Sequence, residues 1–186
     1  MESMILIGLV VLVVVLLLAL IPLYNNIKRR QIAAQSAWSD VDVQLKRRYD
    51  LIPNMVNTVK GYATHEKDTL ERVMTARNAA VNARGVKEQA GAENMLTQAI
   101  GRLFAVAEAY PDLKANQNFL HLQEELTSTE NKIGFSRQHY NRSAAQYNES
   151  IQVFPANMLS GIFNFKDMDY FEIEDPAHKQ APQVQF

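Results

Sequence analysis

Few side chains in this 186-residue chain have the types and spacing that catalysis or metal binding requires. There are no cysteines, which excludes thiolate metal sites, cysteine nucleophiles and disulfides. His65 and Glu66 begin like a zinc-protease motif, but position 69 is a threonine where the second histidine ligand would stand. No histidine has a glutamate three residues before it, as di-iron helical proteins require. We therefore predict no metal or other cofactor and expect four surface histidines: His65, His121, His139 and His178.

Other catalytic and nucleic-acid-binding signatures are also missing from the sequence. There is no glycine-rich phosphate loop, no GxSxG nucleophile elbow and no Ser-x-x-Lys motif. Lysine and arginine number 19 against 20 acidic residues, so no field from the whole chain attracts nucleic acid. The sequence thus argues against an enzyme and predicts no nucleic-acid partner.

The most charged stretch, DVQLKRRYDLIPN at residues 42–54, divides into helix faces once a period of 3.6 residues is applied. Lys46 lies four residues before Asp50, a spacing that forms an ion pair worth about 0.2–0.5 kcal/mol on a helix surface. Pro53 lacks an N–H and should clash with the carbonyl of Tyr49, at a cost near 3 kcal/mol. Three polar residues of this stretch are not explained by such ion pairs, and we predict that they contact another subunit or a partner: Gln44, Arg48 and Asn54.

The elements that would position these residues are all predicted to be helices. Apolar residues recur at steps of 3 or 4 in residues 38–59, in a second helix at about 70–81, in a third from 95 to a stop at Pro111, and in a long fourth from about 112 to 151. Gly61 favours a turn with Thr64 as the next N-cap, although a helix continuous through Gly61 is the alternative. Gly85 and Gly91 predict a loop between them. We therefore expect an all-α chain with an elongated antiparallel four-helix bundle over residues 24–152.

The chain begins with a strongly apolar segment, MILIGLVVLVVVLLLALIPL, at residues 4–23. Twenty helical residues span roughly 30 Å, the thickness of a bilayer's hydrocarbon core. A three-residue tail, 1–3, precedes the segment without a basic residue, and bulky residues follow it, so a retained transmembrane anchor is favoured over a cleaved signal peptide. The basic residues beyond it predict an outside N-terminus and a cytoplasmic bundle: Lys28, Arg29 and Arg30.

Residues 153–171, after the fourth helix, form an apolar and aromatic segment that a down-running helix would return towards the membrane. Two interpretations remain open, a hydrophobic wrap over the bundle's seam, or an interfacial contact with membrane or partner. The residues concerned are Phe154, Met158, Leu159, Ile162, Phe163 and Phe165. The acidic, then Pro- and Gln-rich tail at 172–186 is predicted to be disordered.

Two long motifs, WSDVDVQLKRRYDLIPN at residues 38–54 and VKGYATHEK at 59–67, carry a family resemblance, with YNxxIxxFPxN at 147–157. With the single N-terminal span, they resemble the LemA family of bacterial membrane proteins. The resemblance implies a cytoplasmic helical bundle behind an N-out anchor in the inner membrane, and brings no accepted enzymatic activity. It also implies associations with HtpX-type membrane metalloproteases, envelope stress and magnetosome formation.

The sequence leads to two hypotheses about function. The first is a membrane-tethered helical scaffold that forms homo-oligomers and engages a membrane partner, plausibly an HtpX-type quality-control protease. The alternative is a lipid-organising or membrane-remodelling protein that acts through the basic cluster after residue 23 and the aromatic segment at 154–165.

Overall fold

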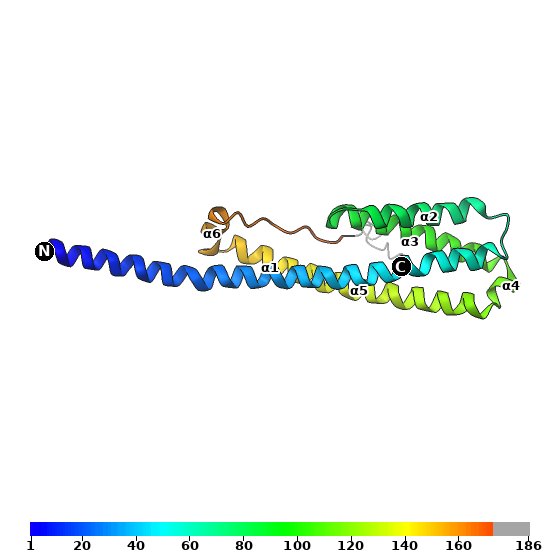
Figure 1. The fold of residues 1–186 in the computed structure, drawn as a ribbon, viewed down its shortest axis with the longest axis horizontal. Helices are drawn as coiled ribbons and strands as arrows, with labels where there is room; N and C mark the ends of the chain where they lie inside the picture. Colours follow the sequence, from blue (N-terminus) through cyan, green and yellow to red (C-terminus); the bar gives the residue numbers. More distant parts are fainter. Residues whose placement is uncertain (173–186) are drawn as a thin grey trace, which may run out of the picture. The chain divides into compact units, whose positions relative to one another are not determined.

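A computed structural model describes residues 1–172, except for the side chains of Val13, Leu16, Leu17 and Ala19 (Figure 1). All regular structure in these residues is helical, which confirms the all-α prediction. The helices are α1 (Glu2–Lys60), α2 (Lys67–Asn82), α3 (Val86–Glu108), α4 (Pro111–Lys114), α5 (Gln117–Gln152) and α6 (Ala156–Ile162).

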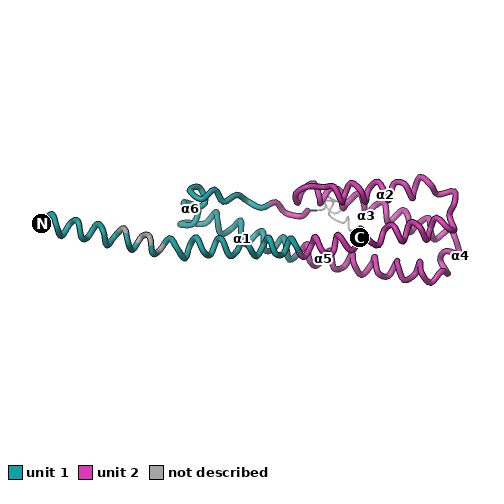
Figure 2. The backbone as a smooth tube through the Cα atoms, in the orientation of Figure 1, with its two compact units in different colours: residues 1–39, 139–168 teal, residues 40–138, 169–186 magenta. Residues whose placement is uncertain are grey.

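The chain divides into two compact units, and both long helices contribute to each (Figure 2). Unit 1 comprises Met1–Ser39 and His139–Met168. Unit 2 comprises Asp40–Gln138 and Asp169–Phe186. Each unit has a core of its own.

The buried apolar residues described in unit 2 come from both long helices and from the shorter helices between them. The predicted stripes of α1 and α5 are confirmed, since Leu45, Ile52, Leu126 and Ile133 are all buried. Helix α2 lies beside α3 and adds Leu70, Val73 and Ala80 to the core. Stripe residues at steps of 3 or 4 thus fix which side of each helix is buried.

The core of unit 1 pairs the first part of α1 with the last part of α5. The Trp38 and Tyr140 rings meet edge to face with centroids 5.1 Å apart. Ala34, Ala37 and Ala144 are fully buried, and these small side chains allow the two helix backbones to approach closely. Ile27 extends this contact into a cluster with Tyr147, Ile151 and Ala156.

The turn predicted at Gly61 is confirmed, but the predicted cap is wrong. Helix α1 ends at Lys60 and α2 begins at Lys67, so the N-cap of α2 is Glu66 rather than Thr64. Two turn hydrogen bonds, from the Ala63 amide to the Val59 carbonyl and from the Glu66 amide to the Ala63 carbonyl, carry the chain past Thr64. The buried methyl group of Ala63 sets the position of this turn.

The loop predicted between Gly85 and Gly91 is also wrong, because α3 starts immediately after Gly85. Gly85 has φ 79° and ψ 164°, a conformation essentially restricted to glycine. The Glu88 carboxylate accepts a hydrogen bond from the Arg84 amide at 2.9 Å and holds the first turn of α3. Gly91 lies within the helix, where the burial of Ala90 and Ala92 outweighs the weak helix propensity of glycine.

The fourth predicted helix begins later than expected. Pro111 occupies the first position of the short α4, where the missing N–H of proline is not needed. Asn116 then caps α5, because its side-chain oxygen accepts a hydrogen bond from the Phe119 amide at 3.0 Å.

Within the described residues, no helix combines the length and the apolar content that crossing a membrane requires. The predicted anchor, residues 4–23, includes the four residues whose side chains lie outside the described part. Of the predicted disordered tail at 172–186, residues 173–186 lie outside it too, and so does His178.

Gly85, the N-cap of α3, and Gly101, within α3, provide a matched test of these local rules. Gly85→Ala should lower the free energy of unfolding by about 1–3 kcal/mol, because alanine is strained at this φ and ψ. Gly101→Ala, at an exposed mid-helix position with open space around it, should raise it by about 0.5–1 kcal/mol. Urea denaturation followed by circular dichroism measures both, and equal effects of the two substitutions would contradict the assigned start of α3.

Candidate functional site

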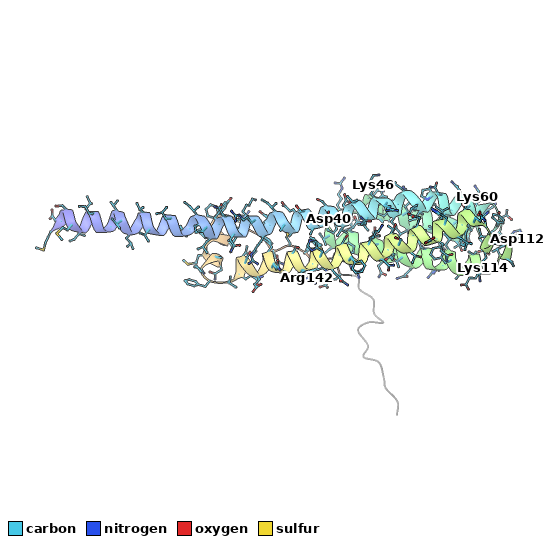
Figure 3. The ribbon with its side chains drawn as sticks, turned by 90° about the horizontal axis from the view of Figure 1, so that it is seen from below. Asp40, Lys46, Lys60, Asp112, Lys114 and Arg142 are labelled. Atoms are coloured by element: carbon cyan, nitrogen blue, oxygen red, sulfur yellow. The ribbon has the colours of Figure 1, made fainter. Side chains whose placement is uncertain are left out.

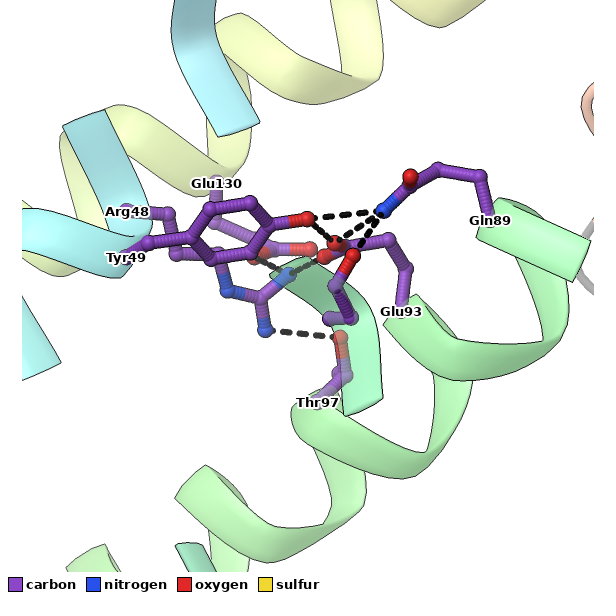
Figure 4. A network of polar contacts seen from close by, with 7 residues as sticks. Arg48, Tyr49, Gln89, Glu93, Thr97 and Glu130 are labelled. Atoms are coloured by element: carbon purple, nitrogen blue, oxygen red, sulfur yellow. Dashed lines mark hydrogen bonds and ion pairs between the residues drawn. The ribbon is translucent and has the colours of Figure 1, made fainter. Parts of the chain in front are cut away.

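A cluster of polar side chains lies inside unit 2, where an apolar core would be expected (Figure 4). Arg48 and Tyr49 come from α1, and Gln89, Glu93 and Thr97 come from one face of α3. Glu130 joins them from α5. The Arg48 and Glu93 side chains are 4% and 2% exposed, so an ion pair is buried between α1 and α3.

The polar atoms of the buried pair are hydrogen-bonded on several sides. Arg48 donates through Nη1 to Glu93 at 3.2 Å and through Nη2 to the Thr97 hydroxyl at 2.8 Å, and its Nη1 lies 3.0 Å from Glu130. The other Glu93 oxygen accepts from the Tyr49 hydroxyl and from Gln89 at 3.0 Å. Because a buried charge is costly unless it is paired and hydrogen-bonded, this arrangement is what makes the burial tolerable.

The protonation behaviour of the cluster follows from its burial. Burial raises the pKa of the Glu93 carboxyl above its ordinary value, although the Tyr49 hydrogen bond and the Arg48 charge oppose this shift. Burial and the Glu93 hydrogen bond raise the pKa of the Tyr49 hydroxyl, which therefore stays a donor at neutral pH. The cluster thus holds a fixed direction of donation from Tyr49 to Glu93.

Pro53 connects this cluster to α2. Proline has no N–H, so the Tyr49 carbonyl four residues earlier lacks its intrahelical hydrogen bond. Nε of Arg77, on α2, donates to that carbonyl at 2.8 Å. Helix α1 therefore continues through Pro53, and the carbonyl that the proline frees becomes the point at which α2 is hydrogen-bonded to α1.

The structure places the three predicted partner contacts in different surroundings. Asn54 is exposed, and Gln44 is half-buried with its side-chain oxygen unpartnered among the described residues. Arg48 is 3% exposed, so the prediction of an accessible contact there is wrong. It lies on the edge of the Leu45–Ile52 stripe and turns inward because Glu93 and Thr97 receive it.

The ion pair predicted on the surface of α1 is present in the structure. Lys46 pairs with Asp50 at 3.4 Å on the surface, as predicted, and Figure 3 shows it on the outer side of α1. Arg47 pairs instead with Glu125 of α5. The Lys46–Asp50 pair lies largely in solvent, where an ion pair contributes about 0–1 kcal/mol, whereas the Arg47 and Glu125 side chains are each about half-buried.

The predicted basic flank lies in unit 1 and makes few contacts beyond its own helix. Lys28 and Arg29 are exposed, and Lys28 donates to Gln31 at 2.7 Å. Arg30 also reaches α5, where it donates to the Gln146 carbonyl at 3.2 Å.

The predicted C-terminal segment separates into inward and outward residues. Leu159 is buried, and Phe165 packs on the cluster around Ile27. The outward residues are exposed: Phe154, Met158, Ile162 and Phe163. The wrap over unit 1 therefore involves only part of this segment.

Sequence reasoning missed the α3 half of the polar cluster. The buried stripe of α3 reads Gln89, Glu93, Leu96, Ile100, Leu103 and Ala107, and the predicted third helix includes neither of its first two positions. Met95, the predicted start of the stripe, is exposed. The available signal was the regular step of 4 from Gln89 to Glu93 and the step of 3 to Leu96.

Metal binding has no structural support in the described part of the chain. The described residues contain no group of three or more His, Asp or Glu side chains that could hold an ion. His65, His121 and His139 are exposed, as predicted.

The sequence model of the LemA family matches residues 37–186. The chain belongs to the LemA family. Two relatives named magnetosome protein MamQ, from Paramagnetospirillum magneticum and Magnetospirillum gryphiswaldense, are each 28% identical and cover 89% and 83% of this chain and 70% and 66% of their own. Protein LemA of Metamycoplasma hominis is 26% identical over 81% of this chain and 69% of its own. The LemA family match includes Arg48, Pro53 and the whole of α3.

The hydrogen bond from Arg77 to the Tyr49 carbonyl should depend on Pro53. Arg77→Met should lower the free energy of unfolding by about 1–3 kcal/mol, because it leaves a part-buried carbonyl without a donor. In a Pro53→Ala background residue 53 regains its N–H, and the same substitution should have a clearly smaller effect. A double-mutant cycle by urea denaturation measures this coupling, and additive effects would contradict it.

The raised pKa of Glu93 predicts a pH dependence of stability. The folded state binds this proton more tightly than the unfolded state, so the group's contribution is largest below the unfolded pKa, near 4.5, and is lost as pH rises through the folded pKa. The difference in unfolding free energy between the native chain and Glu93→Gln should therefore fall from acid to neutral pH.

Glu125→Gln is the control of opposite sign for this measurement. The hydrogen bond and charge of Arg47 lower the pKa of Glu125, so its contribution is present above the unfolded pKa and is lost as pH falls. Urea denaturation across this pH range measures both differences, and a Glu93 difference that rises with pH would contradict the raised pKa.

Proposed function

We propose that this chain is a membrane-tethered helical scaffold, anchored by residues 4–23 with its N-terminus outside and its helical bundle in the cytoplasm. The bundle would form homo-oligomers and engage a membrane partner. The bacterial inner membrane is the proposed location, and the basic residues Lys28 to Arg30, which follow the apolar segment, support a cytoplasmic bundle.

The observation that carries the proposal is the exposure of the apolar start of α1. The large apolar side chains described from Met4 to Ile21 are 39–78% exposed and occur on all sides of the helix. A helix that is apolar all round is stable only when another apolar phase surrounds it. Among the described residues, no helix is long and apolar enough to cross a membrane. The proposal of an anchor rests instead on the exposure of these side chains and on the full sequence of residues 4–23.

A scaffold role is supported by the chemistry of unit 2. Its buried polar groups are used to join helices, and the carboxylate of Glu93 is surrounded by Arg48, Tyr49 and Gln89. An HtpX-type membrane metalloprotease is the partner that the family resemblance suggests, and we propose it as the first candidate. Gln44 and Asn54 are the remaining proposed contact residues on α1.

Charged substitutions in the apolar segment test the anchor. The full chain should remain in the membrane pellet after alkaline carbonate extraction. Leu12→Arg combined with Val15→Arg should release it, since each arginine costs about 2.5–3.5 kcal/mol at the centre of a span. Ile32→Arg, at an exposed apolar residue beyond the segment, should leave the chain in the pellet.

Retention of the double arginine variant in the pellet would contradict the anchor. Self-association and partner binding are tested on the intact chain by detergent extraction, mass photometry and cross-linked capture from native membranes. A strict monomer that captures no membrane protein would contradict the scaffold.

A further inference from the structure

Helix α6 is short, and its two faces differ in a way that core packing does not explain. Ala156 and Leu159 are buried against unit 1. Met158 and Ile162 lie four residues apart on the outward face of α6, and with the flanking Phe154 and Phe163 they are 53–79% exposed. Four large apolar side chains of this segment therefore face out of the unit, whereas Ala156, Leu159 and Phe165 pack inward.

The end of α6 is held in a defined turn that fixes this orientation. Asn164 has φ 54°, and the Phe165 amide donates to the Ser160 carbonyl at 3.0 Å. This six-residue hydrogen bond around a left-handed residue is the Schellman motif that ends helices. The motif returns Phe165 to the core of unit 1 and leaves Phe163 beside it.

Aromatic contacts place α6 at the end of the apolar segment of α1. The Tyr24 ring lies with its centroid 4.9 Å from that of Phe163 and 5.7 Å from that of Phe165. Tyr24 directly follows Leu23, the last residue of the apolar segment. A bilayer that holds residues 4–23 would thus have its interface at the level of α6, where aromatic side chains are favoured.

The charges around α6 suit an anionic lipid surface. Beyond Leu23, unit 1 carries five basic residues against Glu149 and Asp167, a balance of +3. Asp167 accepts a hydrogen bond from Gln152 at 3.0 Å. The basic residues are Lys28, Arg29, Arg30, Arg142 and Lys166.

The segment is also tied firmly to α5, so its outward face is presented by a fixed scaffold. The Asn148 side chain donates to the Met168 carbonyl at 2.9 Å and accepts from the Met168 amide at 2.8 Å. The segment that carries α6 is thus joined to α5 at both ends, by the chain itself after Gln152 and by these two hydrogen bonds at Met168.

We propose that the outward face of α6 inserts into the interfacial layer of the same bilayer that residues 4–23 anchor. The inference rests on the proposed function and adds a second lipid contact, about 140 residues away in the sequence. Two lipid contacts on one unit fix its rotation about the α1 axis, which a single span leaves open.

The absence of cysteine allows this to be tested on the full chain with single-cysteine variants. Met158→Cys reports on α6, Val10→Cys on the anchor, and Ser36→Cys on an exposed position about 20 Å beyond Leu23 along α1. Each is labelled with the polarity-sensitive dye NBD and reconstituted into phosphatidylcholine–phosphatidylglycerol vesicles. The vesicles are prepared with and without lipids that carry a nitroxide quencher high on the acyl chain.

The dye at Met158 should emit at shorter wavelength than at Ser36 and lose about half its fluorescence with the quencher lipid, as expected for interfacial depth. Quenching at Val10 with water-like, unquenched emission at Met158 would overturn the inference and leave the anchor intact. Shielded but unquenched emission at Met158 would overturn it in favour of a protein covering α6. Quenching at Met158 without quenching at Val10 would support the α6 contact and overturn the proposed anchor.

Discussion

The buried ion pair of Arg48 and Glu93 is the interaction on which the packing of unit 2 depends. It joins α1 to α3, and each charged group has further partners that would be left unsatisfied if either helix turned or slid. Such a pair adds little net stability compared with apolar residues of equal volume, but removing one partner leaves an uncompensated buried charge. Its main effect is therefore to select one register among the many that apolar stripes at steps of 3 and 4 would allow.

Pro53 imposes a second constraint on the same region, because it denies the Tyr49 carbonyl its usual donor. Arg77 satisfies that carbonyl from α2, and the Tyr49 hydroxyl satisfies Glu93 from the other end of the same residue. Tyr49 thus links α2 through its backbone and α3 through its side chain. Pro53 removes one hydrogen bond from α1, and α2 and α3 are hydrogen-bonded to α1 at Tyr49, the residue whose carbonyl loses that bond.

Unit 1 is organised differently, around close contact of two helices and a returning segment. Buried alanines let α1 and α5 approach, and Asn148 clamps the chain that follows α6. Its exposed apolar side chains include those described at residues 4–21 and those of the segment around α6, whereas unit 2 buries an ion pair among its apolar side chains.

The sequence by itself determined the all-helical class, the buried stripes of α1 and α5, the turn at Gly61 and the effect of Pro53 on Tyr49. These features depend on residues within one or two turns of each other, so periodicity and backbone chemistry are enough to predict them. The WSDVDVQLKRRYDLIPN motif similarly indicates the family by itself, because its seventeen residues are contiguous in the chain.

Only the tertiary structure decided which side chains at the edge of an apolar stripe are buried and which remain at the surface. Arg47 and Arg48 are adjacent in sequence, yet one pairs at the surface with Glu125 and the other is buried against Glu93. The burial of Arg48 depends on the carboxylate of Glu93, which lies 45 residues away in the sequence. Glu93 lies near the start of α3, where the sequence predicts a loop between Gly85 and Gly91. The division of α6 into a packed and an exposed face likewise depends on Tyr24, which lies on another helix. The spacing of residues within one helix does not predict which residues of other helices they contact.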